Sequence, residues 1–406
     1  MKILFLSEEF PPENTGGAGL IAYNLARELN GLGHDIFVVT HTGKKSDEGE
    51  TNLNGLKIFK VYGSYHPRWQ SWLSLYNPLI ISKIRRVFKK IKPDVIHAHN
   101  IHYYFSYHSL KLAKKYSKAV FLTVHDVMPV NFGKLLLKNN KYVYKVNIFD
   151  QIKEAGKRYN PFRNTIIRHY LKYVDKIFAV SNSLKELLEI NGLKNIQTIY
   201  NGIDVNEWEL DGIKVGEFKN KHNLNEKKVI IFSGRLIEAK GGDQLIKSLA
   251  LVNREFSNFV LLVVGKEWAY TEKIKKISQD LGLEKKLMFT GYLKENELKL
   301  AYNSADVSIF PSLCFEGFGM ANLEAMACRK PTISTFFGGP SEVVIDGETG
   351  NLINPNNIKL MSEKIIDLLK NSEKAKKFGE AGYQRAKKFF SLDKQLKITL
   401  EYYYEK

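Results

Sequence analysis

The chain repeats one pattern twice: short continuous apolar runs alternate with segments whose apolar residues recur at helical spacing. Such runs are typical of strands buried on both faces of a parallel sheet. The first series of predicted strands comprises residues 2–7, 35–40, 57–61, 94–99, 119–125, 176–181 and 196–201. The second series comprises residues 228–234, 259–265, 286–291, 306–312 and 331–335. Two consecutive series predict an α/β fold with two Rossmann-like domains.

The domain boundaries follow from length and composition. The 406 residues exceed one ordinary domain, and residues 202–226 are polar and irregular, as expected of a connector. We expect an N-terminal domain over 1–200, completed by a C-terminal helix at about 388–406 that packs back on it, and a second domain over 201–387. We expect the domains to face each other across a cleft, with ligands at the carboxyl ends of the strands.

The sequence predicts a cytoplasmic protein. No run of 18 or more apolar residues is present, so we expect no transmembrane helix, and MKILFLSEEF at the start lacks the layout of a signal peptide. The two cysteines, Cys314 and Cys328, form neither a disulfide framework nor a metal-ligand pattern.

Positive charge is concentrated in the first half of the chain. Residues 1–200 hold 30 Lys and Arg against 15 Asp and Glu, so they carry +15 of the net charge of +18. A basic half indicates an anionic partner, which could be nucleic acid, a phosphorylated substrate or an anionic membrane; the alternative is charge that serves solubility. Segments 83–90 and 141–172 mix basic and aromatic residues. We expect an anionic or lipid-linked acceptor there; the alternative is solvated helix faces.

The segment SGRLIEAKGGDQLI, residues 233–246, combines a strand end, two cations and a helix start. Arg235 supplies a fixed fork of donors and Lys240 a mobile ammonium, both near the N-terminus of the next predicted helix. This arrangement predicts a diphosphate site; the alternative is a surface loop with ordinary charges. The strand-to-helix turn NTGGAG, residues 14–19, offers backbone amides at Gly16 and Gly17 to a phosphate, or is only a tight turn.

The segment FEGFGMANLEAMA, residues 315–327, places two carboxylates around a predicted helix start. Glu316 lies in the loop and Glu324 within the first turns of the helix, and the backbone amides between them form an anion site. Carboxylates in this position are suited to accept hydrogen bonds from hydroxyl groups. We expect the helix dipole, Arg235 and Lys240 to keep both carboxyl groups ionised.

With these motifs in place, the chain resembles the family-4 retaining glycosyltransferases of the two-Rossmann GT-B fold. The resemblance covers nearly the whole chain, and the E-x7-E element together with the R-x4-K element is its most specific part. The other matching motifs are the GG loop at 16–17, DVIHAHN at 94–100, TVHD at 123–126, AVSNSLKE at 179–186, IYNGID at 199–204 and GGPSEVVIDGETGNL at 338–352.

The resemblance implies a role for each matching residue. Arg235 and Lys240 would hold the donor diphosphate, Glu324 the ribose hydroxyls, and Glu316 the hydroxyls of the donor sugar. His125 would reach the donor sugar near its C6 hydroxyl. The remaining implied donor contacts are the amides of Phe318, Gly319, Met320 and Ala321, the backbone near Tyr292 and Leu293 for the base, and Gly16 and Gly17 for the diphosphate when the cleft closes.

The implied activity is transfer of a sugar from a nucleotide diphosphate sugar, UDP- or GDP-linked, to a glycan or lipid-linked acceptor. We expect retention of configuration, no cofactor, and a place in cell-surface polysaccharide or glycolipid synthesis, with peripheral attachment to the inner membrane face. The alternatives are a sugar-nucleotide epimerase or phosphorylase on the same fold, and a basic nucleic-acid-binding protein. We expect no specific nucleic-acid partner, because no recognisable nucleic-acid motif is present.

Two further features bear on the site. No Asp-x-Asp sequence occurs, and His97, His99 and His102 lack a completing Asp or Cys ligand, so we expect a metal-independent reaction. Arg329 stands where the resembled family usually has a glycine that caps the helix. We expect either a less favourable cap or an added cation near the site.

Overall fold

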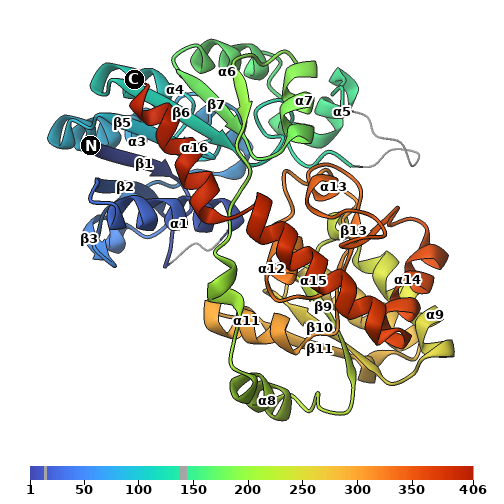
Figure 1. Cartoon of the computed structure of the whole chain (residues 1–406). Helices are drawn as coiled ribbons and strands as arrows, with labels where there is room; N and C mark the ends of the chain where they lie inside the picture. Colours follow the sequence, from blue (N-terminus) through green and yellow to red (C-terminus); the bar gives the residue numbers. More distant parts are fainter. Residues whose placement is uncertain (13–15, 137–143, 406) are drawn as a thin grey trace. The chain divides into compact units, whose positions relative to one another are not determined.

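The computed structural model describes residues 1–12, 16–136 and 144–405 and divides into two compact units (Figure 1). The first unit comprises residues 1–12, 16–135, 144–202 and 392–405, and the second comprises residues 136 and 203–391. Among the described residues, no helix combines the length and the apolar character needed to cross a bilayer.

The first unit is built on an eight-stranded sheet with the order β3-β4-β2-β1-β5-β6-β7-β8. Its strands are β1 (Lys2–Ser7), β2 (Asp35–Thr42), β3 (Gly49–Leu53), β4 (Leu56–Tyr62), β5 (Val95–His99), β6 (Ala119–Val124), β7 (Lys176–Ala179) and β8 (Ile196–Thr198). Every pairing is parallel except that of β3 with β4. The strand order reverses at β1 and β5, where the register pairs Phe5 with His97.

Helices of the first unit are α1 (Gly17–Gly31), α2 (Gln70–Leu73), α3 (Pro78–Ile91), α4 (His108–Tyr116), α5 (Ile148–Ala155), α6 (Arg163–Leu171), α7 (Asn182–Ile190) and α16 (Leu392–Tyr404). The core packs Phe5, Phe121 and Phe178 with Leu396 and Tyr403 of α16. In Figure 1, α16 is drawn in red among the blue and green elements of this unit. The last helix therefore completes the first unit.

The second unit has a six-stranded, wholly parallel sheet with the order β11-β10-β9-β12-β13-β14. Its strands are β9 (Lys228–Ser233), β10 (Phe259–Val264), β11 (Leu287–Gly291), β12 (Val307–Phe310), β13 (Thr332–Thr335) and β14 (Gly350–Ile353). Its helices are α8 (Gly212–Lys221), α9 (Gly242–Glu255), α10 (Ala269–Asp280), α11 (Glu295–Ser304), α12 (Met320–Ala327), α13 (Pro340–Val343), α14 (Ile358–Lys370) and α15 (Ser372–Phe389). The strand order reverses between β9 and β12, so the loops that follow these two strands meet at the position where open α/β sheets bind ligands.

The predicted fold class is confirmed, and three local features differ from the prediction. Strands β3 and β14 were not predicted, because both are short and β3 is an exposed edge strand without an apolar run. The last helix begins at Leu392 rather than at about 388, since α15 ends at Phe389. Between these two helices Ser391 forms a parallel β-bridge with Ile203, and the N–H of Ile203 donates to the carbonyl of Phe390 at 2.9 Å.

Candidate functional site

The N-terminus of α12 lies at the reversal point of the second sheet. Gly319 precedes the helix with φ of 95°, and a Cβ there would lie 2.9 Å from the side-chain Nδ2 of Asn322 and 3.1 Å from the ring of Pro340. Glycine is therefore required by both its backbone conformation and its packing. The N–H of Asn322 donates to the carbonyl of Gly319 at 2.9 Å, whereas the amides of Met320 and Ala321 precede the first intrahelical hydrogen bond and present partial positive charge to an anion.

The loop that carries Glu316 is held by backbone pairing. The backbone N–H of Glu316 donates to the carbonyl of Phe337 at 3.2 Å, and the carbonyl of Glu316 accepts from the N–H of Gly339 at 2.9 Å. Gly338 has φ of 92°, and a Cβ on it would lie 2.3 Å from the Glu316 carbonyl oxygen. This close approach fixes where the Glu316 side chain begins.

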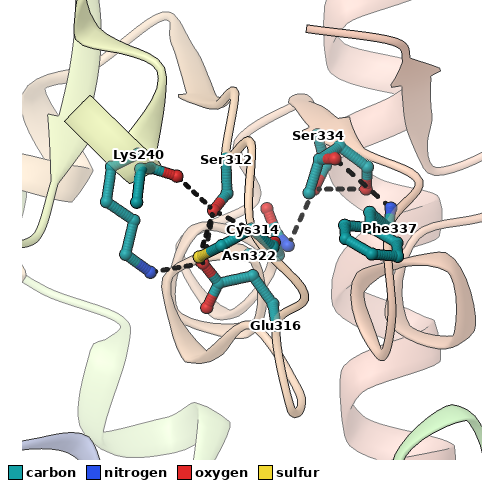
Figure 2. Close-up of polar contacts among 9 residues, drawn as sticks. Lys240, Ser312, Cys314, Glu316, Asn322, Ser334 and Phe337 are labelled. Atoms are coloured by element: carbon teal, nitrogen blue, oxygen red, sulfur yellow. Dashed lines mark hydrogen bonds and ion pairs between the residues drawn. The ribbon is translucent and has the colours of Figure 1, made fainter. Parts of the chain in front are cut away.

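Three side chains converge on one carboxylate oxygen of Glu316, as Figure 2 shows. The ammonium of Lys240 lies 2.5 Å from Oε1 and the thiol of Cys314 lies 3.3 Å from it, while the hydroxyl of Ser312 also donates to it. The side chains of Lys240 and Glu316 are only 13% and 11% exposed. The pair is thus a buried, charge-assisted hydrogen bond.

Lys240 is positioned by the contact between the loops after β9 and β12. It ends a 3₁₀ turn over Glu238–Lys240, after which Gly241 has φ of 76° and would carry a Cβ 2.0 Å from the carbonyl oxygen of Pro311. The N–H of Leu313 donates to the carbonyl of Ala239 at 2.9 Å. The two loops are therefore locked together, and Lys240 and Glu316, far apart in sequence, form one unit.

Arg235 lies in the same β9 loop and is exposed. Within the described part of the chain, no hydrogen bond or ion pair engages its guanidinium. Its donors are directed at no protein acceptor, unlike those of Lys240. The predicted cation pair therefore has one member in a buried ion pair and one in solvent.

Glu324 lies in the second turn of α12, where the hydroxyl of Tyr302 donates to it at 2.9 Å. Burial raises the pKa of Glu324 to about 7, and the Tyr302 hydrogen bond only partly counters this. Burial therefore opposes the expected effect of the helix dipole, Arg235 and Lys240, which was to keep this carboxyl group ionised; Lys240 is paired with Glu316, and Arg235 is exposed.

The residues predicted for the base, Tyr292 and Leu293, directly follow β11. Strand β10 separates β11 from β9, so these residues lie farther along the same carboxyl edge of the sheet. Tyr292 is half-exposed, and the ammonium of Lys266 lies 5.8 Å from its ring centroid. The amide-bearing residues Phe318, Met320 and Ala321 lie at the start of α12, as described above.

Arg329 takes the left-handed conformation, with φ of 54°, just past the end of α12. Its guanidinium pairs with Glu209 at 2.9 Å and Glu380 at 3.0 Å, and lies 3.7 Å from the ring centroid of Tyr383. Of the two expected outcomes, the structure shows the less favourable cap, because these partners hold the cation away from Glu316.

Gly16 and Gly17 start α1 in the first unit, and the preceding Asn14 and Thr15 of the predicted loop lie outside the described residues. A Cβ on Gly16 would lie 2.0 Å from a carboxylate oxygen of Glu9, whereas a Cβ on Gly17 would meet open space. Packing therefore accounts for one glycine of this pair.

His125 follows β6 and is held by two polar contacts. Its Nε2 lies 3.1 Å from Nδ1 of His99, and its N–H donates to Asn100 at 3.3 Å. Burial lowers the pKa of His125 to about 4, so its imidazole is neutral near pH 7. His97 lies beside His99, with ring centroids 4.3 Å apart, and its Nδ1 contacts the hydroxyl of Tyr403 at 2.6 Å. No group of three or more His, Cys, Asp or Glu side chains within the described ranges is arranged to hold a metal ion.

Two features of the sites were not predicted. The hydroxyl of Ser312 donates to Glu316 from four residues upstream, and the sequence signal for this contact was a hydroxyl residue at the end of a predicted strand.

The second feature lies in the first unit, where the buried carboxyl group of Glu8 accepts hydrogen bonds from the N–H groups of Tyr103, Tyr104 and Phe105 at 2.6–3.1 Å. Burial raises the pKa of Glu8 to about 8. This carboxyl group ties the end of β1 to the loop after β5.

Two family models match the chain in succession. Residues 15–207 match the model of Glycosyltransferase Family 4, and residues 215–385 match that of Glycosyl transferases group 1. An uncharacterised glycosyltransferase of Methanocaldococcus jannaschii is 29% identical over 88% of this chain and 86% of its own length. A GDP-mannose-dependent alpha-(1-6)-phosphatidylinositol monomannoside mannosyltransferase of Mycolicibacterium smegmatis is 29% identical over 45% of this chain and 49% of its own.

Solved structures share the fold over the whole chain. Sucrose-phosphate synthase of Thermosynechococcus elongatus has a TM-score of 0.81 at 20% identity, with 100% of this chain and 99% of that chain covered. HepE of Anabaena, in complex with UDP and glucose, has a TM-score of 0.76 at 16% identity, with both chains covered completely. These similarities confirm the predicted GT-B fold.

Proposed function

The chain belongs to the glycosyltransferases of family 4 and group 1, and from this premise we propose that it transfers a hexosyl group from a nucleotide diphosphate sugar with retention of configuration. The observation that carries the proposal is the buried Lys240–Glu316 pair beside the N-terminus of α12. A cation, a carboxylate and free helix amides at a sheet reversal point are the groups that a sugar diphosphate needs.

The proposed roles follow from charge. Lys240, Arg235 and the first amides of α12 stabilise the departing diphosphate, and Glu316 orients the donor sugar. The ammonium of Lys240 has three donors, so a phosphate oxygen shares it with Glu316. Glu324 accepts from the ribose hydroxyls, and His125 contacts the donor sugar as a neutral imidazole.

The proposed reaction needs no base from the protein. The bond between the anomeric carbon and the diphosphate oxygen breaks, and the acceptor oxygen attacks from the same face. The acceptor proton passes to the leaving phosphate oxygen, so atoms and charge balance. Fixed cations in place of a metal are supported by the absence of an Asp-x-Asp sequence.

We propose UDP or GDP as the nucleotide. HepE is solved with UDP, and a mycobacterial relative depends on GDP-mannose, which supports both bases equally. A panel of UDP- and GDP-sugars, screened by thermal stabilisation, identifies the donor because bound ligand stabilises by RT ln(1+[L]/Kd).

The test of the site is the activity of Lys240→Ala and Arg235→Ala, with the exposed Lys285→Ala as control. We expect kcat/KM to fall by the equivalent of about 2–4 kcal/mol in each site variant and to stay unchanged in the control. Near-normal turnover in both site variants would refute the diphosphate assignment. Release of nucleoside diphosphate that depends on acceptor, with product configuration read by NMR, separates retaining transfer from epimerisation and phosphorolysis.

We propose that the acceptor is a glycan or a lipid-linked molecule bound by the first unit at the cytoplasmic face of a membrane, in cell-surface polysaccharide or glycolipid synthesis. The charge of +15 on residues 1–200 supports an anionic surface as partner. On α3, Ile84 and Phe88 are buried while Arg85, Arg86 and Lys89 face solvent. Transfer that increases when the acceptor is supplied in anionic vesicles would support this assignment.

A further inference from the structure

Six large apolar side chains of the first unit are exposed on neighbouring elements. They belong to α2, to the 3₁₀ turn η2 (Pro67–Trp69), to α5, and to the residue that precedes α6. We call these residues the apolar patch: Trp69, Trp72, Ile148, Phe149, Ile152 and Phe162. Phe149 is 79% exposed and Phe162 63% exposed, far above what packing inside the unit would leave.

Helix α5 carries its apolar stripe on the outside. Ile148, Phe149 and Ile152 share one face at a spacing of one and four residues, and all three are exposed. Ala155 is the buried residue of this helix. A helix that packs only within a soluble unit buries its large apolar residues, so this exposed stripe is available to a partner outside the unit.

The elements that carry the patch are held together. Three hydrogen bonds join them: Arg158 Nη1 to Gln70 Oε1 at 2.9 Å, Asn160 Nδ2 to the Ser71 carbonyl at 3.3 Å, and Asn164 Nδ2 to Gln151 Oε1 at 3.0 Å. Because η2 also lies against the turn over Gly156–Arg158, the patch residues form one ordered surface.

Cations surround the patch. Arg68 and Lys153 belong to these elements, and Lys157 and Arg158 belong to the adjoining turn over Gly156–Arg158. The acidic residues of the same elements are Asp150 and Glu154. The guanidinium of Arg68 lies 5.1 Å from the ring centroid of Trp69. The adjoining segment 67–92 holds seven Lys and Arg and no Asp or Glu. Exposed Trp and Phe within a basic rim complement a surface with apolar depth and negative headgroups.

We propose that the apolar patch docks on the surface of an anionic lipid bilayer, with Phe149 and Trp72 inserted among the headgroups and Lys153 and Lys157 against lipid phosphates. A second protein copy fits less well, because two basic rims would repel each other. The inference rests on the membrane part of the proposed function, because docking on a bilayer would bring the protein to its lipid-linked acceptor.

The test is sedimentation of the full chain with vesicles of phosphatidylcholine alone or mixed with phosphatidylglycerol. We expect binding to the mixed vesicles only, a partition coefficient about tenfold lower for Phe149→Ser and for Trp72→Ser, and an unchanged value for Ile213→Ser. Ile213 is the matched control because it is 70% exposed on α8 of the second unit. Lys153→Glu with Lys157→Glu should weaken binding about tenfold and reduce its salt dependence.

Failure of this inference is distinguishable from failure of the proposed function. Absence of wild-type binding to the mixed vesicles, or equal binding by wild type and both patch variants, would overturn docking. A wild-type dimer that Phe149→Ser converts to monomer, seen by light scattering, would assign the patch to a second copy instead. Hydrolysis of the donor in the absence of vesicles reports on the transfer site alone. We expect it to be unchanged in the patch variants.

Discussion

Removal of the Lys240 ammonium should destabilise the second unit, and a second substitution at Glu316 should restore its stability without restoring activity. In Lys240→Met, the carboxylate of Glu316 keeps the Ser312 hydroxyl and the Cys314 thiol but loses its ion partner in a site where it is 11% exposed. Loss of one partner of a buried pair costs about 3–5 kcal/mol, and the remaining hydroxyl donor offsets about 1–2 kcal/mol. We therefore expect the free energy of unfolding to fall by about 3 kcal/mol.

The second substitution of the cycle is Glu316→Gln, which removes the stranded charge while keeping an oxygen for Ser312. In Lys240→Met with Glu316→Gln, we expect most of the lost stability to return, because a neutral pair has no buried charge to compensate. The coupling energy of the cycle should be about 2 kcal/mol or more. Transfer activity should stay low in the double variant, since the proposed contacts of Lys240 and Glu316 with the sugar nucleotide are both lost.

Stability in this cycle is measured by hydrogen exchange of peptides from residues 203–391 in increasing urea. Local exchange is needed because a chain of two units does not unfold in one two-state step. The exposed Lys285→Met serves as the control and should leave exchange unchanged. Strictly additive effects of the two substitutions would refute the buried pair.

Three further predictions concern single positions. Burial raises the pKa of Glu324 from 4.5 to about 7, so the folded second unit holds a proton that the unfolded chain releases. Its unfolding free energy, measured by hydrogen exchange of peptides from residues 203–391 in urea, should fall by about 3 kcal/mol between about pH 5 and pH 8, and Glu324→Gln should remove that fall. Gly338→Ala should cost more than about 2 kcal/mol, because its Cβ meets a carbonyl oxygen at 2.3 Å, whereas Gly17→Ala should leave the melting temperature unchanged. Tyr403→Phe should lower stability by about 1–2 kcal/mol, because His97 loses its hydrogen bond; an unchanged melting temperature would contradict that contact.

The parts of the fold that the sequence predicts are those with a continuous apolar run. Each predicted strand corresponds to an observed one, because an apolar run favours a buried strand even where single polar residues such as Lys57 and Gln197 interrupt it. Edge strand β3 escapes prediction, since its sequence GETNL is exposed and pairs only through backbone groups with β4. The break between α15 and α16 also escapes, because it is produced by the backbone pairing of residues 390–391 with Ile203.

The sequence indicates which residues belong to the candidate site, but it does not indicate which side chains pair with one another. The spacing of Glu316 and Glu324 around two glycines indicates the start of α12, which the structure contains. The direct pairing of Lys240 with Glu316 depends on how closely the β9 and β12 loops approach, which no local pattern reports. The raised pKa of Glu324 likewise comes from its burial in the folded unit, which outweighs the opposing hydrogen bond from Tyr302 on α11. The roles in donor binding stay predictions.

Helix α16 makes the first unit discontinuous in the chain, and this affects how the protein is made. Residues up to 202 are synthesised before the second unit, yet their core lacks Leu396 and Tyr403, and the N–H of Gly202 lacks its Gln395 acceptor at 2.8 Å. Apart from Leu136, the described residues of the second unit form one continuous stretch, 203–391, which can fold as soon as it leaves the ribosome. The unit that is synthesised first is therefore completed last, and its unfinished sheet is the surface that needs protection during synthesis.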